Sequence, residues 1–415
     1  MTDPPSPGHL RLARLSILAA LCLSLTFTAL TVNRERLQDV QTNRFWRVCQ
    51  IWNERGFFRT FGLWLEFRDP GYYSTTGPKA LYAYRGSSTG FLVPLYVVER
   101  LIQAVRGRPS VVVFQLYSQV VVLAGAYILA LIGLRVALRR GATLAFAWTC
   151  ALGAALVFQN FIHNLDRARE IHHSTVSIVL MLAVLLLGDR SPDRPRWAPA
   201  LTAALVFAMA LSDHITNTAF FVLALGLLSF YGVGPVIPRQ EWTLAYVAPA
   251  LLGALVFQAQ LWLGRAVLGV SSIGSPLLFR MGLTNSQYDS HRLIFTFLRP
   301  PWSWGGFAAL AAVGLVVVLA AHRDPKADSR DLPPVLAPLL VHLLLFTFFP
   351  NLVVIHPYVF DVFLIVPSVL VVLVYVPVIA MQRYRRPGVV ALAVLMFSLL
   401  YVSISLVDYS RIAAG

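Results

Sequence analysis

The sequence NRERLQDVQTNRFWRVCQIWNERG, residues 33–56, begins the one long polar stretch in a chain that otherwise consists of successive apolar runs. An apolar run at 13–32 precedes it, and its polar character continues to residue 109. Hydrophobic residues make up 57% of the chain and charged residues 13%, whereas about a quarter of the residues of soluble proteins are charged. The chain is therefore expected to be one integral membrane domain, 1–415, with residues 33–109 as a long loop outside the membrane.

A helix needs about 20 residues to span a bilayer, and apolar runs near this length recur along the rest of the chain. They predict an all-α transmembrane bundle of about eleven spans, at 13–32, 110–137, 142–162, 173–188, 197–212, 215–232, 243–265, 304–321, 334–350, 358–381 and 388–407. No small-residue cleavage site follows the first run, which favours a retained helix over a signal peptide. Polar residues 212–214 interrupt 197–232, which is therefore interpreted as a helical hairpin; a single broken span would reverse the topology downstream.

Basic residues gather in alternate loops, which predicts that these loops face the cytoplasm. They are Arg139 and Arg140; Arg190, Arg194 and Arg196; Arg239; Arg323, Lys326 and Arg330; and Arg383, Arg385 and Arg386. The pattern requires 90–106 to be a surface helix and not a span. The near-absence of lysine suggests a bacterial gene, so the expected location is the bacterial inner membrane. Because the arginines flank apolar spans, the net charge of +15 predicts contacts with anionic lipids and not with nucleic acid.

The first outer loop carries a candidate catalytic acid. Apolar residues recur at helical spacing over 38–54 up to Gly56, which predicts an amphipathic helix on the membrane surface. Asp39 falls in the first turn of this helix. Its carboxylate suits a general base for an acceptor hydroxyl or a metal ligand, and the alternative is that it only stabilises the helix N-terminus.

The rest of this loop combines basic residues with glycines and hydroxyl groups. Arg44, Lys79 and Arg85 accompany the hydroxyl-rich runs 72–79 and 84–90. Arginine donates bidentate hydrogen bonds and glycine allows close backbone approach, so the composition suits a phosphate or a sugar. The alternative is a solvated loop whose arginines meet lipid headgroups.

The second outer loop, 163–172, carries a stripe of possible ligands. His163, Asp166, Glu170 and His173 stand at spacings that place them on one face of a helix. Asp166, Glu170 and His173 suit a divalent cation, Mg²⁺ or Mn²⁺, that would hold a phosphate. Alternatively, the neighbouring arginines at 167 and 169 neutralise the two acids in surface ion pairs.

Three further pairs of polar residues lie at predicted outer turns. Each pair either binds substrate or, as the simpler alternative, caps a helix end. They are Asp213 with His214, His291 with Arg292, and His356 with Tyr358.

These outer features together resemble the GT-C superfamily of membrane glycosyltransferases, which take sugars from polyprenyl-linked donors. The resemblance rests on an acid soon after the first span (Asp39), acids between the third and fourth spans (Asp166 and Glu170), the segment 52–58 at the end of the surface helix, and the late-loop sequence His356-Pro357-Tyr358. It implies that Asp39 is the base, that Asp166 and Glu170 hold a metal or the acceptor, and that an arginine such as Arg292 binds the leaving lipid phosphate.

The sequence also departs from the superfamily. Val40 follows Asp39, so the paired acids of some members are missing, and no large soluble C-terminal domain is expected, which argues against enzymes that glycosylate folded protein sequons. Two other classes stay open: a transporter or flippase for a lipid or lipid-linked glycan, and an assembly protein. A transporter needs polar groups through the bilayer, and few occur within the predicted spans, which favours the enzyme.

Overall fold

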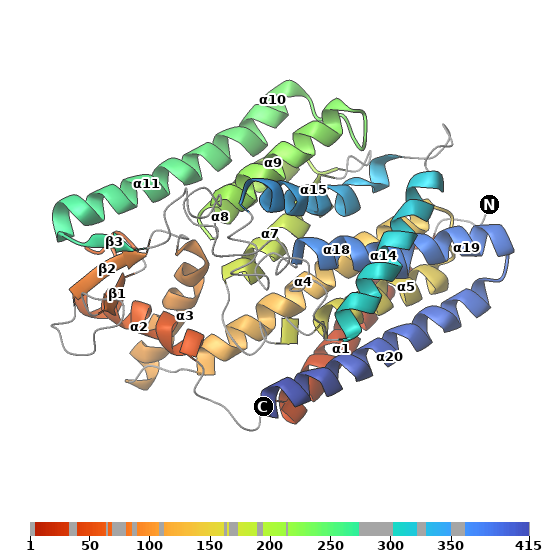
Figure 1. The fold of residues 1–415 in the computed structure, drawn as a ribbon, viewed down its shortest axis with the longest axis horizontal. Coiled ribbons are helices and arrows are strands. Elements are labelled where there is room, and N and C mark those ends of the chain that lie inside the picture. The colour runs from red at the N-terminus through yellow and green to blue at the C-terminus, as the bar shows by residue number, and fades with distance from the viewer. Residues whose placement is uncertain are drawn as a thin grey trace.

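The computed structural model describes residues 5–32, 40–63, 65–68, 80–84, 89–107, 112–161, 164–165, 173–188, 194–212, 215–273, 302–321, 329–349 and 362–414. Helices dominate this part of the chain (Figure 1). The helices are α1 (Pro7–Val32), α2 (Val40–Arg55), η1 (Gly90–Leu92), α3 (Val93–Arg106), α4 (Val112–Arg139), α5 (Leu144–Gln159), α7 (His173–Leu187), α8 (Ala198–Ala210), α9 (Ile215–Phe230), α10 (Arg239–Glu241), η2 (Trp242–Val247), α11 (Ala248–Leu268), α14 (Trp302–Ala321), η3 (Ser329–Asp331), α15 (Pro333–Phe348), α18 (Val362–Leu370), η4 (Val371–Tyr375), α19 (Val376–Tyr384) and α20 (Pro387–Ala414). The strands are β1 (Leu65–Arg68), β2 (Ala80–Tyr84) and β3 (Ser271–Ile273).

Every apolar run predicted as a span contains a helix, and the predicted hairpin at 197–232 is two helices, α8 and α9. Among the described residues, 5 helical stretches are long and apolar enough to cross a membrane: Pro7–Thr28, Leu116–Arg139, Arg239–Leu268, Phe363–Tyr384 and Pro387–Val407. These stretches indicate an integral membrane protein. The other apolar helices are shorter, so the number of spans stays a prediction.

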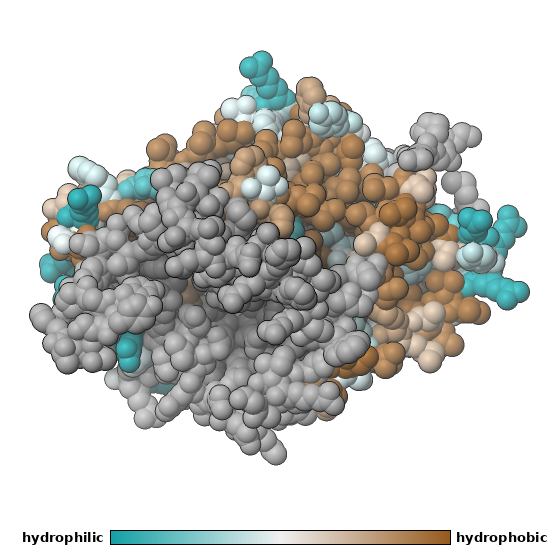
Figure 2. All heavy atoms as spheres, viewed as in Figure 1, coloured by the Kyte–Doolittle hydropathy of each residue, from teal (hydrophilic) through white to brown (hydrophobic). Residues whose placement is uncertain are grey.

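The core of the bundle forms around α4, α5 and the α18–η4–α19 helix, whose apolar side chains are largely buried. The outer helices instead expose apolar side chains, such as Leu23 of α1, Leu255 of α11 and Met396 of α20. Figure 2 shows this apolar surface over the helices, with hydrophilic side chains toward the edges of the view. Exposed apolar belts of this kind suit contact with lipid.

The bundle has two chemically different ends, toward the lower left and the upper right of Figure 1. At one, which we call the sheet end, β2 pairs with β3, and the Gly90 amide donates to the Leu211 carbonyl. At the other, the arginine end, Arg139 pairs with Asp331, and Arg194 pairs with Glu241. In these contacts, described residues that flank loops predicted for the same side of the membrane lie at the same end of the bundle.

The three-stranded sheet was not predicted, because the connector between the two surface helices was expected to lack regular structure. In the sheet, β1 pairs antiparallel with β2, and β2 pairs parallel with β3. The parallel pair joins segments almost two hundred residues apart, such as Tyr82 with Ser271, so no local pattern marks it. Two helices are also longer than predicted: α1 begins at Pro7 and α20 continues to Ala414.

Candidate functional site

Helix α2 and the continuous η1–α3 helix lie at the sheet end and form what we call the surface layer. Their bounds are close to those predicted for the two surface helices, 38–54 and 90–106. Gly56 follows α2 with a left-handed φ of 87°, and Gly107 follows α3 with a φ of 70°, conformations that glycine adopts without strain. The layer has its own apolar core, in which α2 packs on η1, α3 and the start of α4. Its buried residues are Phe45, Val48, Cys49, Trp52, Phe91, Leu92, Leu95 and Phe114.

Trp52 is the centre of this small core and is fully buried. Its indole nitrogen donates a 2.8 Å hydrogen bond to the Leu63 carbonyl. The Phe57 and Tyr96 rings meet it edge-on, with centroids 5.0 and 5.4 Å away. One side chain thus joins α2, the turn after it and α3.

The turn at 56–63 connects the layer to the helical bundle. The Gln260 side chain of α11 donates to the Phe61 carbonyl at 2.9 Å. The Thr89 hydroxyl donates to the Gly62 carbonyl, and the Gly90 amide donates to the Leu211 carbonyl at the end of α8. These bonds fix the surface layer on two helices of the bundle.

Helix α3 exposes apolar residues and buries an acid. Val97, Leu101 and Val105 are 50%, 63% and 86% exposed, whereas Glu99 is completely buried against α2. An exposed apolar face on a surface helix suits insertion at the membrane interface. This arrangement fits the prediction that 90–106 lies on the membrane.

Glu99 is a buried polar residue at this end that the sequence did not single out, because no local pattern predicts its burial against α2. The Asn53 amide donates to Glu99 Oε2 at 3.5 Å. Within the described part of the chain, Glu99 Oε1 and Asn53 Oδ1 are buried and have no hydrogen-bond partner. Burial, and secondarily the charge of Glu99, raise the pKa of the Cys49 thiol. Buried acceptors without partners are rare and point to an additional ligand or water.

The start of the second outer loop is held by amides of α5. Asn160 accepts a hydrogen bond from the Thr28 hydroxyl of α1 at 3.2 Å and donates to Ser24 Oγ at 3.1 Å. The Gln159 amide donates to the Leu21 carbonyl at 3.2 Å. The chain that leads into the stripe from His163 to His173 is therefore fixed against α1.

The predicted site residues themselves lie outside the residues whose side chains the structure describes. Arg44 is in α2 and His173 opens α7, and of these two the helical backbone alone is described. The others are Asp39, Lys79, Arg85, His163, Asp166, Glu170, Asp213, His214, His291, Arg292, His356 and Tyr358. Some described flanks of their segments lie close together: the Leu211 carbonyl accepts from the Gly90 amide, and Phe220 near the start of α9 contacts Phe348 at the end of α15.

Metal binding stays a prediction that rests on Asp166, Glu170 and His173. The described residues contain no cluster of three or more His, Cys, Asp or Glu side chains placed to hold a metal ion.

The comparisons with known proteins add no relative. No protein-family model matches the chain, and no curated protein matches it.

Proposed function

We propose that the protein is a glycosyltransferase of the kind that the GT-C resemblance implies. It transfers a sugar from a polyprenyl-phosphate donor to an acceptor on the outer side of a bacterial inner membrane. The observation that supports the proposal is that described flanks of several predicted outer segments lie together at the sheet end, where β2 pairs with β3 and the Gly90 amide donates to the Leu211 carbonyl. A site at the end of a membrane bundle, beside a lipid-facing surface helix, suits a donor that is itself a lipid.

In the proposed reaction Asp39 accepts the proton of the acceptor hydroxyl as that oxygen bonds to the anomeric carbon of the sugar. The bond from this carbon to the phosphate oxygen breaks, and the polyprenyl phosphate leaves. An arginine such as Arg44, Arg85 or Arg292 stabilises the charge that develops on the phosphate. Asp166 and Glu170 hold the acceptor directly or through Mg²⁺ or Mn²⁺.

Asn53 and Glu99 pair between the two surface helices, and one side-chain oxygen of each is buried without a hydrogen-bond partner among the described residues. The Trp52 core holds α2 and α3 together and so keeps these atoms at the sheet end.

The test uses membranes that contain the full chain and labelled polyprenyl-phosphate sugars. Asp39→Asn should lower the rate of transfer by at least about a hundredfold, the range for loss of a general base. Glu54→Gln is the matched control, because Glu54 is an exposed carboxylate within the predicted surface helix 38–54 that also contains Asp39. The control should keep the wild-type rate.

Other results would contradict the proposal. Full activity of a folded Asp39→Asn variant would remove Asp39 as the base. Absence of transfer from every donor, together with movement of the labelled lipid across liposome membranes, would instead identify a flippase.

A further inference from the structure

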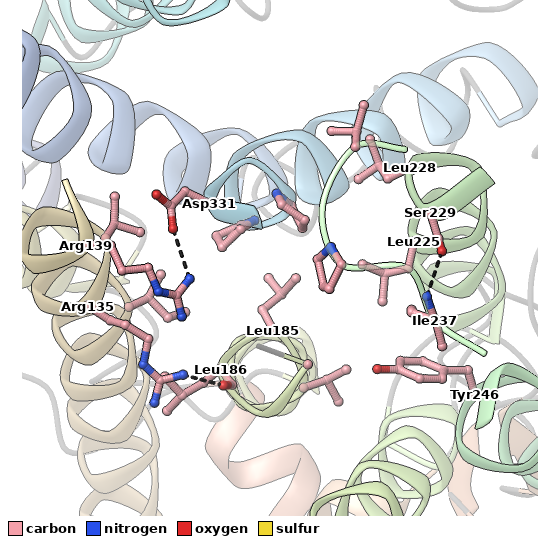
Figure 3. Close-up of a pocket in the computed structure, with 18 residues that line it drawn as sticks. Arg135, Arg139, Leu185, Leu186, Leu225, Leu228, Ser229, Ile237, Tyr246 and Asp331 are labelled. Atoms are coloured by element: carbon pink, nitrogen blue, oxygen red, sulfur yellow. Dashed lines mark hydrogen bonds and ion pairs between the residues drawn. The ribbon is translucent and has the colours of Figure 1, made fainter. Parts of the chain in front are cut away.

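The two ends of the bundle use their polar side chains differently. At the arginine end, charged groups meet beside a cavity between α4, α7, α9 and α15 (Figure 3). There Arg139 pairs with Asp331 at 3.0 Å, and Arg135 donates to the Leu186 carbonyl at 3.0 Å. Helix α5 begins shortly after Arg139, so its last turn lies away from the arginine end. The amides in that last turn join α5 to α1.

Asn160, the residue that follows α5, makes the main connection between the two helices. It is 1% exposed. Its Oδ1 accepts from the Thr28 hydroxyl at 3.2 Å, and its Nδ2 donates to Ser24 Oγ at 3.1 Å and to the Leu156 carbonyl at 2.9 Å. The two partners on α1 lie one turn apart on the same face of that helix. Because hydrogen bonds are directional, an amide that bridges two helices in this way fixes their relative position more closely than apolar contact does.

The first described residues of the second outer loop are fixed as well. The Asn164 side chain donates to the Phe158 carbonyl at 2.5 Å, and its backbone amide donates to the Phe161 carbonyl at 2.7 Å. The Leu165 amide donates to the same Phe161 carbonyl at 2.9 Å, and the Leu165 side chain is buried in the main core of the bundle. The predicted ligand Asp166 is the next residue in the chain. One peptide unit therefore separates Asp166 from a segment that is tied to α5 and, through it, to α1.

We propose that Asn160 is a positioning residue of the proposed active site, which holds the chain at residue 166 in a fixed position relative to α1. The inference rests on the proposed function, in which Asp166 holds the acceptor. Asn160 acts through the segment up to residue 165 and not by contact with the acceptor. Without its bonds to α1 this segment shifts, and a misplacement of about 1 Å far from the reacting atoms can lower a rate by about a hundredfold.

Sugar transfer by the purified full chain in lipid vesicles tests this role. A labelled polyprenyl-phosphate sugar is the donor, and a lipid and glycan extract of the native membranes supplies the acceptor. Asn160→Ala should raise about tenfold the amount of extract that gives half-maximal transfer, because the acceptor is misplaced, and should leave the donor KM unchanged. A purely structural defect would instead lower the maximal rate and leave both values unaltered, which would overturn the positioning role.

Both variants of this contact are expected to fold. In Asn160→Ala the hydroxyls of Ser24 and Thr28 can turn to carbonyls of their own helix, as Thr26 already donates to the Cys22 carbonyl at 2.9 Å. Thr28→Val removes one partner of Asn160 with little change in volume. It should raise the same half-saturating amount of extract by a smaller factor. The thermal unfolding midpoint of each variant measures its stability.

Ser16→Ala is the matched control, because Ser16 of α1 accepts a hydrogen bond from the Trp148 indole of α5 at 2.9 Å, nearer the start of both helices. This change also removes a hydrogen bond between α1 and α5, but it should leave the half-saturating amount of extract unchanged. An equal rise in Ser16→Ala would show that only the general packing of α1 on α5 matters, and would overturn the role of Asn160. An unchanged value in both Asn160→Ala and Thr28→Val would overturn it as well.

Hydrogen exchange separates a failure of this inference from a failure of the proposed function. The amides of Asn164 and Leu165 should exchange faster in Asn160→Ala than in wild type or Ser16→Ala, whatever reaction the protein catalyses. Faster exchange in a protein whose wild type transfers no sugar would refute the proposed function and the catalytic role of Asn160, but would confirm that Asn160 anchors the loop. Unchanged exchange in Asn160→Ala would overturn the anchor even if wild type transfers sugar.

Discussion

At the scale of single residues, Gly90 shows how closely the surface layer approaches the bundle. Its amide donates to the Leu211 carbonyl at 2.6 Å, and a Cβ at this position would lie 2.2 Å from that oxygen. The Leu211 carbonyl belongs to the backbone and cannot rotate away as a flexible side chain can. The whole surface layer would therefore have to move away from α8. Glycine is therefore required here by contact and not by φ.

We predict that Gly90→Ala destabilises the protein by about 1–3 kcal/mol, the usual cost of overpacking. The measurement is the thermal unfolding midpoint in detergent. Gly388→Ala is the control, because a Cβ at Gly388 meets nothing within 4 Å. Equal midpoints for Gly90→Ala and wild type would show that the layer is not packed on α8 as described.

Cys49 gives a prediction on pH. Burial, followed by the charge of Glu99, raises its thiol pKa above the ordinary value of about 8.5. Below about pH 8.5 the thiol is neutral in both folded and unfolded chains, and its contribution to stability is complete. Above that pH the unfolded chain releases the proton and the folded chain retains it, so stability falls by up to about 1.4 kcal/mol per pH unit.

Thermal unfolding measured between pH 7.5 and pH 9.5 tests this predicted loss of stability. The midpoint of wild type should fall more steeply with pH than that of Cys49→Ala. Burial is the largest cause that raises the Tyr96 pKa, and Cys49 also contributes, so both proteins carry Tyr96→Phe in this comparison. Parallel slopes would contradict the burial of a neutral thiol at this position.

At the scale of elements, α2 and α3 form a unit that depends on Trp52. Trp52→Ala removes a fully buried ring and its hydrogen bond to Leu63, a change that costs about 3–5 kcal/mol. Because the cluster around Trp52 belongs mainly to the surface layer, we predict local loosening of 40–63 and 89–106 before the bundle opens.

Hydrogen exchange of the Trp52→Ala variant measures this loosening. Amides of α2 and α3 should exchange faster, whereas those of α5 should keep their protection. Phe58→Ala is the matched control, because Phe58 is 87% exposed beside the same cluster. Faster exchange throughout α5 as well would show that layer and bundle unfold as one unit.

The elements also show why the sequence predicted the helices but not the sheet or the packing within the surface layer. Apolar length marks the bundle helices, and Gly56 and Gly107 mark where the surface helices end, since both signals are local. The β2–β3 pair and the burial of Glu99 depend on contacts between distant segments, which no local pattern carries. For 90–106 the distribution of basic residues favoured a surface helix, and the structure confirms a helix there, but its burial against α2 is decided by tertiary packing.

At the scale of the whole molecule, two ends with different chemistry follow from the alternation of the chain through the bundle (Figure 1). The sheet end holds the surface layer and the β2–β3 pair, and the arginine end holds ion pairs such as Arg194 with Glu241 at 2.7 Å. If the bundle spans a membrane, these ends lie in different compartments. The surface layer and the arginine end would then lie at opposite faces of the membrane.

Cysteine accessibility in intact cells tests this arrangement. In a variant without native cysteines, Arg106→Cys at the end of α3 should react with a membrane-impermeant maleimide from outside. Arg386→Cys, between α19 and α20, should react only after the cells are opened, as should a cysteine at position 190 in the predicted cytoplasmic loop. Labelling of 106 and 386 from the same side would contradict a membrane-spanning bundle with these two ends. Labelling of 386 alone from outside would reverse the orientation and place the proposed active site in the cytoplasm.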